Sequence, residues 1–453
     1  MEHPQSPLIV NTPESLKPTM MEEKLTQRII DLMQREVVPA VGCTEPAAVA
    51  LCVARAAELL GCRPEKLDVA LSANMLKNAM GVGIPGTGMT GLPIAIALGA
   101  LCGRSDDGLE VLARVTPEDV ERGKEYIATG AISIRLATDA PSVLHIDVRA
   151  EGQGRTSRAV ISESHTNIVF EVADGTTLQD KRTVGRHAGA SADSGPETDA
   201  DPELTLKQVW DFATTTPLER IAFIARAAQL NINAADQAFR HSYGHSLGRI
   251  VAGPGKKFFG DTPVAHMISY TSAACDARMG GCPVAVMSNS GSGNQGITCT
   301  MPVVSFARDV DADREHTLRA LALSNLVSIY IKQSLGRLSA LCGCVVAGTG
   351  ASSGIAYLMG AGYEQVCAAV KNMVANLTGM LCDGAKPSCA MKIASATSTA
   401  MLSALLAMNG QCASCSEGIV CEDVDRTIHN LTSIGKDAMR ATDALVLEIM
   451  TNK

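Results

Sequence analysis

The sequence is poor in aromatic residues, which make up 3% of its 453 residues and include a single tryptophan. The core must therefore be built from alanine, valine, leucine, isoleucine and methionine, a mixture that favours packed helices. Basic residues are not in excess either, because the formal net charge is -8 at pH 7. Together with the lack of a basic cluster, this charge gives no reason to expect a nucleic-acid partner.

Long apolar runs and export signals are missing too. The sequence contains no unbroken apolar run of about 20 residues, so it predicts no membrane span. Residues 1–20 lack the basic start and apolar stretch of a secretory signal and are interpreted as a flexible tail. We therefore expect a cytoplasmic protein with no membrane partner. Disulfides are not expected in that reducing compartment, so the 15 cysteines should be core residues, catalytic thiols or metal ligands.

Two hydrophobic patterns divide the chain. Residues 21–104 and 204–453 mostly show helical spacing, whereas segments within 105–184 alternate as strands do. A polar stretch at 185–203, rich in glycine, serine and aspartate, predicts a linker. We expect an α+β protein with a predominantly helical catalytic domain (21–104 and 204–453) and a small inserted α/β domain (105–184). A homodimer is expected only because homodimers are the commonest oligomers of soluble proteins.

The segment "VGCTEP" places Cys43 at the start of a predicted helix. Thr44 or Glu45 would cap this helix, and Pro46 suits its first turn. The positive end of a helix dipole stabilises a thiolate and lowers its pKa. Cys43 is therefore a candidate reactive thiol, with a buried turn cysteine as the alternative.

Four further cysteines lie in two glycine-containing segments. Cys342 and Cys344 occur in "LCGCVVAGTG", and Cys382 and Cys389 in "LCDGAKPSC". Thiolates from separate loops can converge on zinc or an iron–sulfur cluster. The spacing is neither that of a zinc ribbon nor that of a ferredoxin, so core packing is an equally good interpretation of the spacing alone.

Two polar segments could contact a ligand. His165 in "SESHTNIVF" could bind a carboxylate or move a proton, or it could be a surface histidine bonded to its neighbours. The segment 287–303, "MSNSGSGNQGITCTMPV", is glycine-rich, and backbone N–H groups in such a loop can hold an anion. Neither the dinucleotide fingerprint nor the P-loop pattern is present, and no lysine context indicates pyridoxal phosphate.

Six segments together resemble the L-cysteine desulfidase family, which is related to the iron–sulfur L-serine dehydratase α chain. They are "VPAVGCTEP", "NAMGVGIPGTG", "SHTNI", "SNSGSGNQGI", "LCGCVVAGTGASSGIAYLMGAG" and "NLTGMLCDGAKPSCAMK". The resemblance covers roughly residues 21–450. Serine dehydratases have a "CDP…PC" pair with a longer spacing than "CDGAKPSC" here.

The resemblance implies a 4Fe–4S cluster held by Cys382, Cys389 and one cysteine of "LCGC". Cys342 is favoured over Cys344 for this third position. It also implies that Cys43 is the catalytic thiol and acts as a base. A cluster held by three thiolates leaves one iron open as a Lewis acid for the substrate carboxylate or the leaving sulfur.

The implied reaction removes the Cα proton of L-cysteine, expels hydrogen sulfide from Cβ and yields pyruvate and ammonia. His165 could reach the site from the inserted domain. The polar residues expected to contact the substrate are Glu45, Asn167, Asn289, Ser290, Ser292 and Asn294. Two other functions stay open: an L-serine dehydratase on the same fold, and a non-enzymatic protein that binds an amino acid without a cluster.

Overall fold

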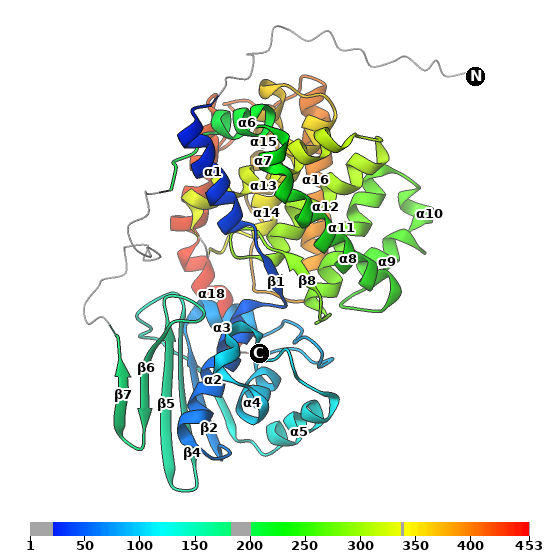
Figure 1. Ribbon diagram of the computed structural model, residues 1–453. Helices are drawn as coiled ribbons and strands as arrows, with labels where there is room; N and C mark the ends of the chain where they lie inside the picture. Colours follow the sequence, from blue (N-terminus) through cyan, green and yellow to red (C-terminus); the bar gives the residue numbers. More distant parts are fainter. Residues whose placement is uncertain (1–20, 183–200, 337–338, 453) are drawn as a thin grey trace.

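The computed structural model describes residues 21–182, 201–336 and 339–452 and shows two lobes (Figure 1). The predicted tail at 1–20 lies outside the described residues, and so does most of the predicted linker at 185–203. Short antiparallel strands β1 (Pro39–Val41) and β8 (Ala285–Met287) pair at the boundary between the lobes.

The lower lobe is built on a mixed six-stranded sheet with the order β3-β2-β4-β5-β6-β7. Strand β2 is parallel to β3 and antiparallel to β4, and the remaining neighbours are antiparallel. The strands are β2 (Lys66–Leu71), β3 (Ile132–Leu136), β4 (His145–Gly152), β5 (Arg155–Ser162), β6 (Ile168–Ala173) and β7 (Thr176–Asp180).

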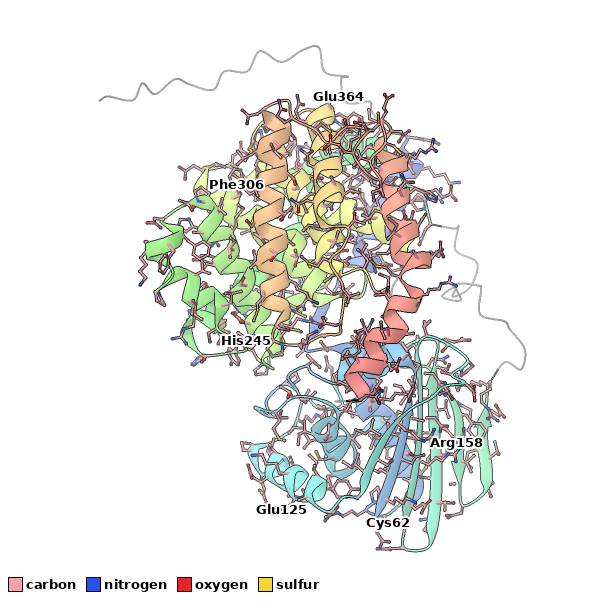
Figure 2. The ribbon with its side chains drawn as sticks, turned by 180° about the vertical axis from the view of Figure 1, so that it is seen from behind. Cys62, Glu125, Arg158, His245, Phe306 and Glu364 are labelled. Carbon is pink, nitrogen blue, oxygen red and sulfur yellow. The ribbon has the colours of Figure 1, made fainter. Side chains whose placement is uncertain are left out.

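The two faces of this sheet differ. Helix α2 (Thr44–Leu60) packs on β4, β5 and β6, with α4 (Leu92–Cys102) beside it and α5 (Pro117–Ala128) packed on α4 (Figure 1). The opposite face carries ion pairs between strands, including Arg158–Asp147 at 2.8 Å, and Figure 2 shows Arg158 on this sheet. One covered face and one charged face are typical of a largely antiparallel sheet.

The upper lobe is helical. Its longer helices are α1 (Glu23–Glu36), α6 (Leu206–Thr215), α8 (Ala225–Arg240), α11 (Pro263–Met279), α12 (Gly293–Asp309), α13 (Arg314–Leu335), α14 (Gly343–Leu358), α15 (Tyr363–Leu377), α16 (Cys389–Met408), α17 (Val424–Ser433) and α18 (Arg440–Thr451). Shorter helices are α7 (Leu218–Ile221), α9 (Leu247–Ala252) and α10 (Lys256–Phe259).

Helix α14 lies in the core of the upper lobe and packs against α12, α13, α15 and α16. Its residues are small or apolar on all sides, as in a fully buried helix. A Cβ atom on Gly350 would lie 2.2 Å from Ser324 O, and one on Gly354 would lie 2.9 Å from Ala320 O. Glycine at these positions therefore lets α13 and α14 approach closely.

The structure confirms the predicted α+β class with a majority of helix. The predicted domain boundary at residue 104 does not coincide with the lobe boundary, because β2 (Lys66–Leu71) lies inside the sheet and α2 packs on it. The sheet lobe therefore begins near residue 44. The sequence of residues 66–72, "KLDVALS", predicts a short strand, but it carries no information about which strands it pairs with.

The two lobes are also joined at the end of the chain. Helix α18 reaches α3 (Ala73–Ala79) of the lower lobe, and Figure 2 shows it running down onto that lobe. Here Lys77, which is 3% exposed, pairs with Asp443 of α18. The contact places a buried charge at the lobe boundary.

Among the described residues, α16 (Cys389–Met408) is long and apolar enough to cross a membrane by length and composition. It packs against α11, α14 and α15, and half of its apolar window is buried in the protein. This is the behaviour of a core helix, so α16 gives little support for a membrane span.

Candidate active site

Cys342 and Cys382 are brought together by backbone pairing. The short segments 340–342 and 380–382 pair antiparallel. Backbone hydrogen bonds from the N–H groups of Cys342 and Cys382 join the segments, with lengths of 3.0 and 2.7 Å. The two side chains are then within hydrogen-bonding reach, and this contact raises the pKa of Cys382 well above its usual value.

Cys344 lies behind this pair. Its Sγ atom is 3.2 Å from Cys342 Sγ and 3.1 Å from Met380 Sδ. The contact with Cys344 raises the pKa of Cys342 to about 12. In a strand these alternate cysteines would point to opposite faces, but α14 begins at Gly343 and its first turn brings them together.

The loop between Cys382 and Cys389 is held by Lys386 and Lys392. Both lysines pair with the Asp383 carboxylate and donate to backbone carbonyls of the same segment. Burial alone would raise the pKa of Asp383, but the two lysines lower it to about 2. The loop is therefore a charged and internally bonded structure that presents two thiols.

The same loop docks on the lower lobe. Gly384 has φ +88°, and a Cβ atom there would lie 2.2 Å from Lys77 O on α3. The charge of Lys77 lowers the pKa of Cys382, opposing the neighbouring thiol and burial. The thiol cluster thus lies where the upper lobe meets α3.

Cys43 belongs to the same region. It is the N-cap residue of α2 and is 4% exposed, and its thiol interacts electrostatically with that of Cys389. Burial raises the pKa of Cys43 to about 12, while nearby Arg278 lowers it only in part. The sequence predicted a lowered pKa from the helix terminus, and this is wrong because desolvation is the larger effect.

Arg278 and Asn294 connect Cys43 to the glycine-rich segment. Arg278 lies near the end of α11 and donates from Nη2 to Gly42 O at 3.1 Å and from Nη1 to Asn294 Oδ1 at 3.0 Å. The guanidinium is also within hydrogen-bonding reach of the Cys43 thiol. Cys275, buried one turn earlier, lies 3.7 Å from Asn294 Oδ1.

The other polar residues of this segment act mainly within it. Asn289 is fully buried, donates twice to Asn325, and accepts from Ser290 Oγ and Gln295 Nε2. Its hydrogen-bonding capacity is satisfied inside the protein, and contact of Asn289 with the substrate stays a prediction. Ser290 is bonded to Asn289, and Ser292 accepts from Gln295 N as the N-cap of α12.

Glu45 lies in the first turn of α2, beside Cys43, where it raises the pKa of that thiol. Its Oε2 accepts from Thr44 Oγ1 at 3.2 Å. Among residues 21–182, 201–336 and 339–452 no cationic side chain lies within 4.0 Å of it. Glu45 is therefore the charged member of the predicted substrate set that borders the thiols.

His165 and Asn167 lie on the loop between β5 and β6. The loop is at the end of the sheet from which α3 also leaves, since Ser162 pairs with His145 and His145 O accepts from Ser72 N. Asn167 lines a surface hollow of about 420 Å³ together with Arg55, Glu171 and other residues, none of which is a cysteine. Contact of this loop with the substrate stays a prediction.

Four helix N-termini meet around the cysteines. Cys43 caps α2, Cys342 caps α14, α16 begins at Cys389, and Ser292 caps α12. Each N-terminus carries partial positive charge from its free N–H groups. With Arg278, this arrangement produces a site that favours anions.

Within the described residues, no group of three or more His, Cys, Asp or Glu side chains has the geometry to hold a single metal ion. A cluster distributes its protein ligands over several irons and needs thiols from separate segments. Cys342 comes from one segment and Cys382 and Cys389 from another, and the thiol of Cys382 interacts with both of the others. The donor set therefore fits a cluster better than one ion.

Sequence reasoning missed Arg278, Cys275 and Lys77. Arg278 and Cys275 lie in "AACDARMGGC", where charged residues interrupt a small-residue helix directly before two glycines. Charges in an otherwise apolar helix are the signal that could have identified Arg278, because buried charges are rare without a purpose. Lys77 carried no such signal.

Comparison with known proteins gives the family. Residues 106–448 match the serine dehydratase alpha chain family. A "UPF0597 protein" of Bacteroides thetaiotaomicron is 56% identical over 434 residues, which cover 96% of this chain and 99% of that protein. Proteins of the same name from Oleidesulfovibrio alaskensis and Aeromonas hydrophila are 47% and 42% identical, covering 94% of this chain and 98% and 96% of theirs. The chain belongs to the serine dehydratase alpha chain family.

Proposed function

We propose that this protein is a cytoplasmic iron–sulfur lyase that eliminates sulfide from L-cysteine and yields pyruvate, ammonia and hydrogen sulfide. Membership of the serine dehydratase alpha chain family supports a lyase. The observation that carries the proposal is the meeting of the half-buried Cys342, Cys382 and Cys389 near the buried Cys43.

The thiols Cys342, Cys382 and Cys389 would hold a 4Fe–4S cluster. Lys77 and Lys392 interact electrostatically with this thiol group, and their charges would offset part of the negative charge of the thiolates. When bound, the cluster would supply a Lewis acid at the iron that no cysteine holds.

The chain's own residues would provide the proton transfer. Cys43 would take the proton from Cα, and the positive charge of Arg278 would balance its thiolate. Sulfur then leaves Cβ as hydrogen sulfide, and the aminoacrylate that remains hydrolyses to pyruvate and ammonia. Because burial raises the pKa of Cys43 to about 12, its thiol would have to lose its proton before it acts as the base, and the positive charge of Arg278 favours that loss.

L-Serine dehydration is the second candidate, and the family match favours it. The same proton would be removed, and hydroxide would leave in place of sulfide. The "GCTEP" segment and the short spacing from Cys382 to Cys389 favour cysteine by resemblance alone.

The test begins with anaerobically purified protein. We expect a brown protein with about four irons and four sulfides per chain. It should release sulfide and pyruvate from L-cysteine, and L-serine is assayed beside it. A colourless anaerobic preparation without iron would contradict the proposal. Pyruvate release from L-serine but not from L-cysteine would favour the second candidate, L-serine dehydration.

Matched cysteine variants test the assigned roles. Cys43→Ser should keep the iron and lose most turnover, whereas full activity would show that Cys43 is not the base. Cys382→Ala should lose the iron. Cys52→Ala should retain both, because Cys52 is buried against the sheet with its thiol 3.3 Å from Ala159 O.

A further inference from the structure

Two unpaired and opposite charges flank the Cys43 thiol. Arg278 lowers the pKa of this thiol and Glu45 raises it, so both lie close enough to act on it electrostatically. In the part of the chain that the structure describes, neither side chain has an oppositely charged partner within 4.0 Å. A buried guanidinium without a carboxylate is costly unless a ligand supplies the negative charge.

Arg278 is well placed to bind such a ligand. It is 7% exposed, its Nη atoms donate to the neutral acceptors Gly42 O and Asn294 Oδ1, and its Nε atom is buried without a partner. The neighbouring acid on α11, Asp276, accepts instead from Gly248 N at 3.1 Å. A guanidinium has five N–H donors, so some remain after these two bonds and the contact with the Cys43 thiol.

The surroundings of Arg278 add to its demand for an anion. A Cβ atom on Gly293, the first residue of α12, would lie 2.3 Å from Arg278 Nε. The guanidinium therefore lies directly on the positive end of α12, an arrangement that is electrostatically unfavourable without an anion. This is an observation independent of the missing acidic partner.

We infer that Arg278 binds the α-carboxylate of an amino acid and Glu45 binds its α-ammonium group, which places Cα beside Cys43. This deepens the proposed function and rests on it for the reaction, while the binding itself does not require turnover. A zwitterion brings one charge of each sign, so it compensates both side chains without changing the net charge of the site. Charge-assisted and bidentate hydrogen bonds to Arg278 would give the carboxylate its orientation.

The test uses ligands that cannot lose a group from Cβ, measured by calorimetric titration of anaerobically purified full-length protein. The probes are L-alanine, propionate, which lacks the ammonium group, and L-alaninamide, which lacks the carboxylate. Arg278→Gln should weaken L-alanine and propionate about 10- to 100-fold and leave L-alaninamide unchanged. Glu45→Gln should weaken L-alanine and L-alaninamide and leave propionate unchanged.

Two variants act as controls of charge. Arg308→Gln, in the last turn of α12, and Glu121→Gln, on the exposed side of α5, remove the same charges elsewhere and should change no affinity. If Arg278→Gln does not fold, Arg278→Lys keeps the charge but loses the forked donor geometry and should still weaken L-alanine. The thermal unfolding midpoint of each variant is measured to test whether the variant is folded.

Three outcomes would overturn the inference. These are no binding of L-alanine to the unmodified protein, equal weakening of all three probes by Arg278→Gln, and unchanged binding of propionate in Arg278→Gln. The last outcome would leave the Cys43 thiolate as the counter-charge of Arg278. Failure of the proposed function gives a different result, because L-alanine would bind as expected while neither L-cysteine nor L-serine is turned over.

Discussion

Replacing Gly384 by alanine should loosen the thiol loop from the lower lobe. Two separate penalties apply at this position. The backbone has φ +88°, which costs a residue with a Cβ about 1–2 kcal/mol. The new Cβ would lie 2.2 Å from Lys77 O, a backbone atom that moves only if α3 moves, and such overpacking costs about 1–3 kcal/mol.

The sequence contains controls that separate the two penalties. A Cβ on Gly410, with φ +71°, meets nothing within 4 Å, so Gly410→Ala should cost about 1–2 kcal/mol from conformation alone. Gly379 has neither a positive φ nor a neighbour within 4 Å, and Gly379→Ala should stay within about 0.5 kcal/mol. Gly384→Ala should therefore cost about 2–5 kcal/mol, the sum of both penalties.

Denaturant unfolding gives these free energies, and iron per chain after anaerobic purification reports on the site. We expect Gly384→Ala to be the least stable of the three and to hold the least iron, because Gly384 lies in the loop between Cys382 and Cys389. If Gly384→Ala matched Gly410→Ala in stability and kept its iron, the close contact between this loop and α3 would be refuted.

Two further predictions concern charged pairs. Asp443→Asn removes the partner of a buried lysine on α3 and should destabilise the protein by about 3 kcal/mol in denaturant unfolding, and no change would mean that this pair does not join the lobes. His266 hydrogen-bonds to Asp261 and Asp309, which raise its pKa, and Asp261 also pairs with Lys256. The stability that charged His266 contributes should be fully present below pH 6.5 and lost as pH rises through the raised pKa. His266→Gln should remove this pH dependence of the unfolding free energy. A variant with the same pH profile as the unmodified protein would contradict the prediction.

The sequence predicted local elements better than their partners. Within 105–184 alternating patterns located β3, β4 and β5 but not β6 or β7, and helical spacing located most of the upper lobe. Strand β2 was recognised as a strand, but its pairing with β3 and β4 depends on contacts between distant parts of the chain. Such pairing is decided by packing in the folded protein, so the lobe boundary could not be read from periodicity.

The candidate site shows the same division. Spacing alone left Cys382 and Cys389 undecided between ligands and core residues, and only the family resemblance led to the prediction of a cluster. The helix terminus at Cys43 was predicted, with a buried cysteine left open as the alternative, and burial reverses the expected direction of the pKa shift. Arg278 was missed because its role depends on Gly42, which is distant in sequence and belongs to the other side of the site.

The scarcity of aromatic residues bears on how such a site can form. Helix N-termini can meet around one group of cysteines only if the helices themselves pack closely. Small residues make this possible, as at Gly350, where a Cβ would lie 2.2 Å from a carbonyl oxygen of α13. The ends of α12, α14 and α16 then concentrate positive charge where Cys342 and Cys389 lie. Larger side chains along α14 would separate these ends and weaken the field, so Gly350→Ala should impair anion binding although Gly350 is buried against α13.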